Sequence, residues 1–183
     1  MNPGNPAAAV RWPDVPACYG WLSLDRRGNW RLKGDLVRHS GLVAFINRHY
    51  GTDGKGNWIF QNGPQAVYVA LDYTPLIFRF EFDGRLLDHT GSEAGAAGAV
   101  WLDDEGNVLL QTPAGVGLLD DRDLGGFIDA CRTGDGKSLD DCGRAGLLPD
   151  QMQVCWRGLL LQSIPRHQVA DRFGFNAVPG PGG

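Results

Sequence analysis

General acid–base chemistry is the first function to test, because the chain has four histidines among 21 acidic residues. Asp88 and His89 are the one place where the two types are adjacent. Neighbouring residues of a strand point to opposite faces, so these two cannot form a direct dyad. His39 with a carboxylate from the polar segment 132–143 is the other combination. A hydrolase acting on a polar metabolite through His89 or His39 is therefore the alternative hypothesis for function.

Other catalytic patterns are missing from the sequence. It has no Gly-x-Ser-x-Gly elbow, no phosphate-binding loop of the Walker type, no His-Glu-x-x-His and no dinucleotide fingerprint. The four cysteines show no Cys-x-x-Cys spacing, so we expect buried free thiols rather than a zinc or redox site; they are Cys18, Cys131, Cys142 and Cys155. We expect no cofactor and no metal, and we favour a protein that is not an enzyme.

A short loop of amide side chains is the best candidate for ligand contact. Gln61-Asn-Gly-Pro-Gln65 lies between two strand-like runs, and amides on a rigid loop can pair with a polar ligand. The simpler interpretation is a tight turn that uses Asn62 and Gly63 before Pro. Arg79, on an aromatic strand, is either a snorkelling edge residue or an anchor for an anion. The predicted contact residues are Gln61, Asn62, Gln65, Tyr68, Arg79 and Trp58.

The motif Asp-x-x-Gly-Asn occurs three times, at residues 25–29, 53–57 and 103–107. Asp can accept a hydrogen bond from the backbone two residues on, and Gly can adopt the left-handed conformation, so each copy predicts a hairpin turn. Calcium binding is the other interpretation, but an EF-hand needs more oxygen ligands and a Glu at its twelfth position.

Two of these turns begin a longer repeat. Each is followed by a helical segment with the pattern Leu-x-x-Phe-Ile-(Asn/Asp), at Phe45-Ile46 and again at Phe127-Ile128. The turn glycines are 106 − 28 = 78 residues apart and the phenylalanines 127 − 45 = 82. The spacing predicts an internal duplication into two similar lobes, although hairpins and amphipathic helices also recur by chance. Expected caps are Ser40 and one of Asp120, Asp121 or Asp123 at the start, and Gly51 and Gly134 at the end.

The expected fold class is α+β, mainly antiparallel sheet with one helix packed on each half. Residues 66–73 and 76–82 alternate with the period of two of half-buried strands, and Asp83-Gly84 predicts a hairpin. The small-residue stretch 92–98 predicts the boundary between halves. The expected organisation is a flexible N-terminus at 1–15, lobes at 16–91 and 98–175, and a flexible tail at 176–183.

The net charge and the hydropathy of the chain limit the classes of partner that it can bind. The net charge of −4 disfavours nucleic acid, which requires a basic surface, and also disfavours anionic lipid. No run approaches the roughly 18 apolar residues of a membrane span, and residues 1–10 lack the features of a signal peptide. We therefore expect a cytoplasmic protein with no nucleic-acid or membrane partner.

The block Gly56-Asn-Trp-Ile-Phe-Gln-Asn-Gly-Pro-Gln, with Thr74-Pro75 and the earlier Gly28-Asn-Trp, resembles an uncharacterised family of bacterial proteins of unknown function. The resemblance covers about residues 16–120. It implies a bacterial origin and a compact α+β fold, and it transfers no catalytic residue.

The main hypothesis is a binding or regulatory protein whose small polar ligand or protein partner contacts the Asn62–Gln65 loop and nearby aromatics. A homodimer formed through an exposed sheet edge is a further hypothesis.

Overall fold

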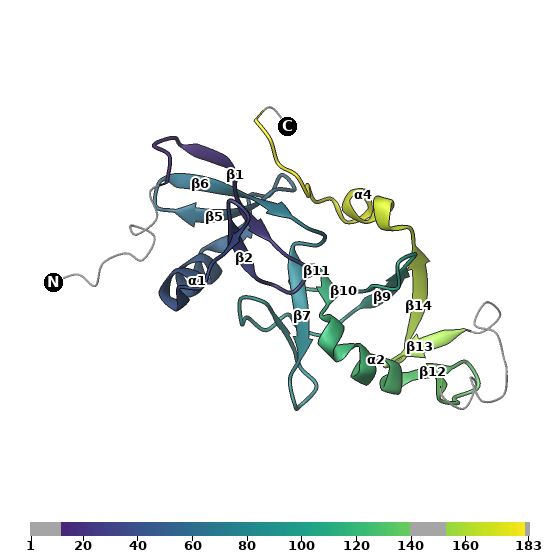
Figure 1. The fold of residues 1–183 in the computed structure, drawn as a ribbon. Coiled ribbons are helices and arrows are strands. Elements are labelled where there is room, and N and C mark those ends of the chain that lie inside the picture. The colour runs from purple at the N-terminus through teal and green to yellow at the C-terminus, as the bar shows by residue number, and fades with distance from the viewer. Residues whose placement is uncertain (1–11, 140–152, 182–183) are drawn as a thin grey trace.

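The computed structural model describes residues 12–139 and 153–181. The first of its two sheets has six strands in the order β3-β2-β1-β6-β5-β4 (Figure 1). These strands are β1 (Ala17–Leu24), β2 (Trp30–Leu32), β3 (Asp35–Leu36), β4 (Tyr50–Thr52), β5 (Trp58–Asn62) and β6 (Gln65–Leu71). Helix α1 (Ser40–Arg48) connects β3 to β4 and packs its buried Leu42 and Ile46 against this sheet.

The second sheet has eight strands in the order β12-β13-β14-β9-β10-β11-β7-β8. Its strands are β7 (Leu76–Phe80), β8 (Leu86–Asp88), β9 (Ala99–Asp103), β10 (Val108–Thr112), β11 (Gly115–Leu119), β12 (Cys131–Thr133), β13 (Val154–Trp156) and β14 (Leu159–Ile164). The chain passes from the first sheet to the second between β6 and β7, at Thr74-Pro75, because β7 pairs with β11. The strands β7 and β8 therefore precede the stretch 92–98 and yet belong to the second sheet.

The two sheets share one strand order. The first sheet has the order β3-β2-β1-β6-β5-β4, and the second contains the equivalent order β11-β10-β9-β14-β13-β12. The second sheet also continues beyond β11 with β7 and β8. In both, the central pair is parallel, β1 with β6 and β9 with β14, and its neighbours are antiparallel. The prediction of mainly antiparallel sheet is thus too simple, because each sheet is mixed. Parallel strands cannot be joined by a tight hairpin, and a long connection that includes a helix separates β1 from β6 and β9 from β14.

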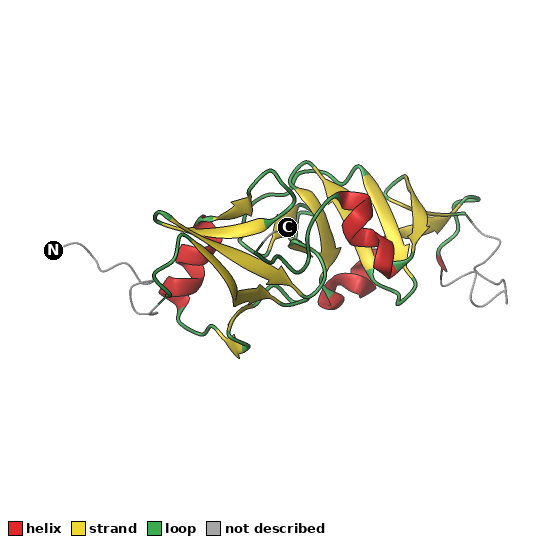
Figure 2. Cartoon of the chain, turned by 90° about the horizontal axis from the view of Figure 1, so that it is seen from above, coloured by secondary structure: helices red, strands yellow, loops and turns green. Residues whose placement is uncertain are grey.

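Three short helices are described, rather than one in each half. Helix α2 (Leu124–Ala130) follows the 3-10 turn η2 (Asp121–Asp123), and α4 (Val169–Phe173) follows η4 (Arg166–Gln168). The helices α2 and α4 lie with the second sheet, whereas α1 lies at the other end of an elongated molecule (Figure 2).

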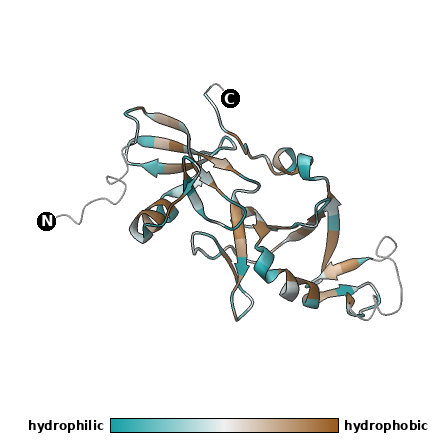
Figure 3. Ribbon diagram, in the orientation of Figure 1, coloured by the Kyte–Doolittle hydropathy of each residue, from teal (hydrophilic) through white to brown (hydrophobic). Residues whose placement is uncertain are grey.

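Two cores hold the elements together. The first combines the inner face of the first sheet with α1, with Val169 of α4 and with one face of the second sheet, including Trp101 and Leu109. The second lies on the other face of the second sheet, where Phe127 of α2 packs against Trp156. With both faces covered, β9, β10 and β11 are almost continuously buried and hydrophobic (Figure 3).

The start of α1 and the ends of both α1 and α2 differ from the prediction. The N-cap of α1 is His39, whose Nδ1 accepts a hydrogen bond from Leu42 N at 3.1 Å, so Ser40 is the first helical residue instead. The N-cap residue of α2 is Asp123, one of the three predicted aspartates, although its side chain makes no capping hydrogen bond, and Asp120 caps η2. The C-caps are His49 and Cys131 rather than glycines, because a strand begins directly after each helix.

The three Asp-x-x-Gly-Asn turns are confirmed as hairpins. In each, Oδ1 of Asp accepts hydrogen bonds from the backbone N–H groups two and four residues on, and the Asn amide donates to the same carboxylate. The turn glycines, including Gly28 at φ +77° and Gly106 at φ +84°, are left-handed. The hairpin at Asp83-Gly84, between β7 and β8, is also confirmed.

Part of the segment 132–143 forms β12 and a tight turn at 133–137, and its remainder from residue 140 lies outside the described residues together with Cys142. Cys18, Cys131 and Cys155 are free thiols. Among the described residues, no helix has the length and apolar character needed to span a membrane.

Candidate functional site

A polar pocket lies where the two sheets meet. It has a volume of about 590 Å³, within the usual range for small-molecule sites. Three segments form it: the turn 25–29 of the first sheet, the β7–β8 strands with residues 88–91, and the Asp120–Asp123 segment before α2. Residues far apart in the sequence are therefore brought to one place by the contact between sheets.

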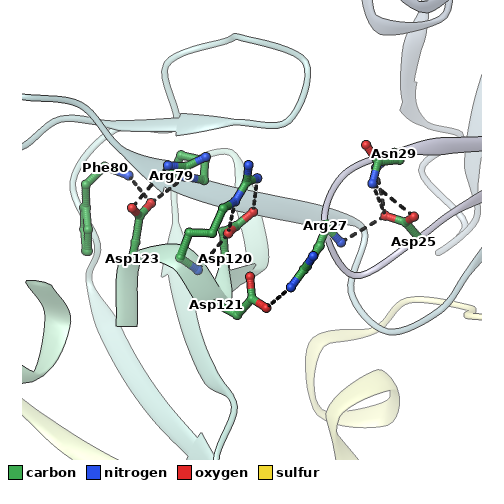
Figure 4. A network of polar contacts seen from close by, with 9 residues as sticks. Asp25, Arg27, Asn29, Arg79, Phe80, Asp120, Asp121 and Asp123 are labelled. Carbon is green, nitrogen blue, oxygen red and sulfur yellow. Dashed lines mark hydrogen bonds and ion pairs between the residues drawn. The ribbon is translucent and has the colours of Figure 1, made fainter. Parts of the chain in front are cut away.

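Three arginines converge on this pocket, and a carboxylate holds each one. Arg79 Nε lies 2.7 Å from Asp123 Oδ2, and Arg27 Nη2 lies 2.6 Å from Asp121 Oδ2. Figure 4 shows the three aspartates of the segment, with Asp121 turned toward Arg27 and Asp123 turned toward Arg79. The ion pairs set the position of each guanidinium but engage only some of its five N–H donors.

Arg122 makes a bidentate pair with Asp120, at 2.7 Å from Nε to Oδ1 and 2.6 Å from Nη2 to Oδ2. The Asp120 side chain is 1% exposed, whereas that of Arg122 is 56% exposed. Burial on its own would raise the pKa of Asp120, but the hydrogen bonds from Arg122 outweigh it and lower that pKa. Asp120 is therefore ionised at neutral pH and fixes a guanidinium that faces solvent.

His89 lines the pocket from the second sheet. Its Nδ1 accepts a hydrogen bond from Ile77 N at 3.4 Å, which places the proton of the neutral ring on Nε2. The ring lies edge-on to Trp30 and Tyr50, with centroids 5.3 and 5.4 Å away, and Nε2 has no hydrogen-bond partner among the described residues. Burial lowers the pKa of His89 to about 4, although the nearby Asp88 charge opposes the shift.

The turn 25–29 presents Arg27 and Gly28 to the pocket. Asp25 accepts hydrogen bonds from Arg27 N and Asn29 N, at 3.0 and 2.9 Å, and so sets the course of the backbone. A Cβ atom on Gly28 would lie 2.6 Å from Cβ of His89, so this glycine is required for close approach as well as for its positive φ.

The amide loop predicted to contact a ligand uses its side chains within the protein. Gln65 is buried, and its Nε2 donates to the carbonyl oxygens of Pro13 and Val15 at 2.7 and 2.6 Å. Gln61 Nε2 donates to Gly63 O at 2.7 Å, and Asn62 Nδ2 lies 3.4 Å from Gln65 Oε1. The loop closes the β5–β6 hairpin and fastens the segment before β1 to it.

The other predicted contact residues are dispersed. Tyr68 stacks on Tyr19 with ring centroids 4.3 Å apart, and Trp58 packs on Tyr50 at 5.1 Å. Arg79 lines the pocket between the sheets, whereas Asn62 and Gln65 line a separate pocket beside residues 12–16. The structure thus separates Arg79 from the amide loop.

The histidines do not form a catalytic arrangement within the described residues. His39 is exposed and caps α1. Asp88 Oδ1 accepts from the backbone N–H groups of Thr90 and Ser92, at 2.8 and 3.1 Å, so it supports a turn and is not hydrogen-bonded to His89. No group of three or more potential metal ligands is found among the same residues.

Sequence patterns do not identify most of the pocket. They predict only helix caps in the segment Asp120-Asp-Arg-Asp123 and only a turn at Arg27. The sequence does contain a usable signal, since four consecutive charged residues directly follow the buried strand at 115–119. Its pairing with Arg79 depends on β7 lying beside β11, which no local pattern shows.

The DUF2944 family model, with the description "Protein of unknown function (DUF2946)", matches residues 2–180. The chain belongs to this family. The resemblance to an uncharacterised family is thereby confirmed, and the match extends beyond residues 16–120. None of the curated proteins compared with this DUF2944 protein matches it.

Two solved structures are similar to it. A DUF1285 family protein from Silicibacter pomeroyi DSS-3 matches with a TM-score of 0.53 and 13% identity over 88% of each chain. A DUF1285 family protein from Shewanella baltica OS155 has a TM-score of 0.46 and 16% identity, over 60% of this chain and 91% of that one. At such identity the first likeness concerns the fold alone.

Proposed function

We propose that this DUF2944 protein is a non-enzymatic binding protein whose small polar ligand occupies the pocket between the two sheets. The observation that carries the proposal is the convergence of Arg27, Arg79 and Arg122 on one pocket, each held in place by a carboxylate. Preorganised guanidiniums can bind a ligand without the entropic cost of ordering flexible side chains.

A binding role is favoured over hydrolysis by the state of His89. The ring is neutral, surrounded by Trp30 and Tyr50, and not hydrogen-bonded to a carboxylate that could orient it as a base. Hydrolysis through His39 would require an exposed helix cap to act without a carboxylate partner in the described structure.

The family resemblance and the acidic net charge support a bacterial, cytoplasmic setting. Asn62, which lines the pocket beside residues 12–16, stays a proposed second contact, for a protein partner. A second copy of the chain, added at a sheet edge, is the partner that we would test first.

We also propose that the two sheets arose by internal duplication. The identical order of six strands, with the same parallel centre, supports this origin. The equivalent turns also touch, since Arg26 Nη2 donates to Asn107 Oδ1. Superposition of residues 17–71 on 99–164 tests the idea: a common path through all six strands and the helix supports it, and divergent helix placement would remove it.

A thermal-shift screen against metabolites tests the binding role, because a ligand that prefers the folded state raises the Tm. We expect one class of polar compound to raise the Tm of the wild type, and Arg27→Gln and Arg122→Gln to lose that shift. Arg85→Gln is the matched control, because Arg85 also pairs with the aspartate two residues before it but lies outside this pocket.

Each variant is compared with its own unliganded Tm, since Arg122→Gln leaves the buried Asp120 without its guanidinium. Arg27→Gln avoids that complication, because its side chain is 63% exposed. No shift for any compound in the wild type, or a shift that both pocket variants retain, would contradict the proposal.

A further inference from the structure

The pocket contains unused hydrogen-bond donors on its arginines. Arg79 and Arg122 each engage their aspartates through Nε and Nη2. Within the described chain, no hydrogen bond reaches Nη1 of either residue. A guanidinium that is held on one edge and free on the other is suited to an anionic oxygen, and a carboxylate matches its geometry.

Unused acceptors lie in the same pocket. The carboxylate of Glu81 has no hydrogen-bond or ion-pair partner among the described residues, and it lines the pocket beside Arg79. Asp88 is engaged through Oδ1 alone, so Oδ2 is available. These oxygens are suited to a group that donates several hydrogen bonds, such as an ammonium.

The charge balance decides between classes of ligand. Three arginines and four carboxylates line the pocket, namely Arg27, Arg79, Arg122, Glu81, Asp88, Asp120 and Asp123, which gives 3 − 4 = −1. A ligand with several negative charges would meet net repulsion, whereas a ligand with one charge of each sign would meet a partner for both.

One of the apolar residues that line the pocket is exposed. Phe82 has 111% of its reference area in water, and it lines the pocket next to Glu81. A ligand or partner that covers this exposed phenylalanine would remove its apolar surface from water, which is favourable.

We infer that the ligand is a zwitterion of the α-amino-acid type with an apolar or aromatic side chain. Its carboxylate would meet the free edges of Arg79 and Arg122, its ammonium Glu81 and Asp88, and its side chain Phe82. This inference rests on the proposed function and adds the ligand class to it.

Isothermal titration calorimetry of the full chain with three matched compounds tests the inference. L-Phenylalanine carries both charges, 3-phenylpropanoate only the carboxylate and phenethylamine only the ammonium. We expect L-phenylalanine to bind at least about tenfold more tightly than either analogue, which corresponds to one additional paired charge. Glu81→Gln should weaken L-phenylalanine binding by about tenfold, and Phe82→Ser should weaken L-phenylalanine more than glycine.

Arg85→Gln is again the control and should bind L-phenylalanine as the wild type does. Equal affinity for all three compounds, or no binding of any amino acid, would overturn the inference. If a compound of another charge type raises the Tm and loses its effect in Arg27→Gln, the proposed function stands and the zwitterion inference fails. If no library compound binds in the pocket, both fail.

Discussion

The two helices that follow the equivalent hairpins carry one motif but bury different members of it. In α1, Ile46 is 0% exposed and Phe45 is half-buried, whereas in α2 Phe127 is 3% exposed and Ile128 is 47% exposed. Adjacent helical residues are about 100° apart around the axis, so the two helices differ in rotation against their sheets. The motif therefore specifies a helix, and the surface opposite selects which face it buries.

That surface differs in the two halves. Phe127 of α2 stacks on Trp156 with ring centroids 5.4 Å apart, inside the second core. Phe45 of α1 meets Phe60 edge-on at 5.6 Å and is also covered by His49, at the margin of the first core. We therefore expect Phe127 to contribute more than Phe45 to the free energy of unfolding, although both belong to the same motif.

The largest expected effect is at these helix positions. Phe127→Ala should lower the free energy of unfolding by about 3–5 kcal/mol, and Ile46→Ala by about 2–5 kcal/mol, because both side chains are buried. Phe45→Ala and Ile128→Ala should each cost under about 2 kcal/mol, since both stay partly in water. Urea unfolding measures all four. Equal losses at Phe45 and Phe127 would show that the two helices are packed alike.

The second expected effect is the pH dependence of stability that arises from His89, which lies against the 25–29 hairpin turn. His89 has a pKa of about 4 in the folded protein against 6.5 in the unfolded chain. The unfolded state therefore binds a proton first as the pH falls. The contribution of neutral His89 to the free energy of unfolding is complete above pH 6.5. This contribution is lost as the pH falls from 6.5 to about 4, and the total loss is about 3 kcal/mol.

His89→Asn removes this titration and keeps an acceptor for Ile77 N. Urea midpoints at pH 7 and pH 5 should fall further for the wild type than for the variant. A parallel fall of both would show that His89 is not the group responsible.

The third expected effect is a difference in the stability cost of replacing the turn glycine of two equivalent hairpins. Gly106→Ala should cost about 1 kcal/mol, because its φ of +84° is unfavourable for alanine but the space is open. Gly28→Ala should cost about 2–3 kcal/mol, because the new methyl group must also displace His89. Thermal unfolding of both variants gives the difference, and equal losses would place His89 away from the turn.

The smallest expected effect is a difference in the stability cost of replacing the first aspartate of the same two hairpin turns. Asp103 is buried and accepts a hydrogen bond from Tyr73 Oη at 2.6 Å, whereas Asp25 pairs with Arg31 near the surface. Asp103→Asn should cost about 1–2 kcal/mol and Asp25→Asn under about 1 kcal/mol. Chemical denaturation at pH 7 tests the order, and a larger loss at Asp25 would reverse the comparison.

Local patterns account for the turns and many of the strands. The Asp-x-x-Gly-Asn hairpins follow from the hydrogen bonds of one side chain to its own backbone, which need no distant partner. Strand alternation at 66–73 and 76–82 likewise depends on neighbouring residues. The rotation of α1 and α2 could not be predicted, because it depends on which side chains lie opposite.

The candidate site shows the same limit. The sequence indicates Arg79 as a potential anion anchor, but its partner Asp123 lies 44 residues away and reaches it through the parallel pairing of β7 with β11. The residue types of the amide loop suit recognition of a ligand, but the side chains of Gln61 and Gln65 already donate hydrogen bonds to backbone carbonyl oxygens. Residue type indicates what a side chain can bind, and only the packing shows which bonds it has already made.

The most direct test of the account is where a ligand binds. Amide chemical shifts of 15N-labelled protein would be followed by NMR during titration with the compound that most raises the Tm. We predict that the perturbed amides cluster at residues 27–28, 79–82, 88–91 and 120–123, around the pocket between the sheets. Perturbations confined to residues 61–66 and 12–16 would instead place the ligand at the amide loop and contradict the account.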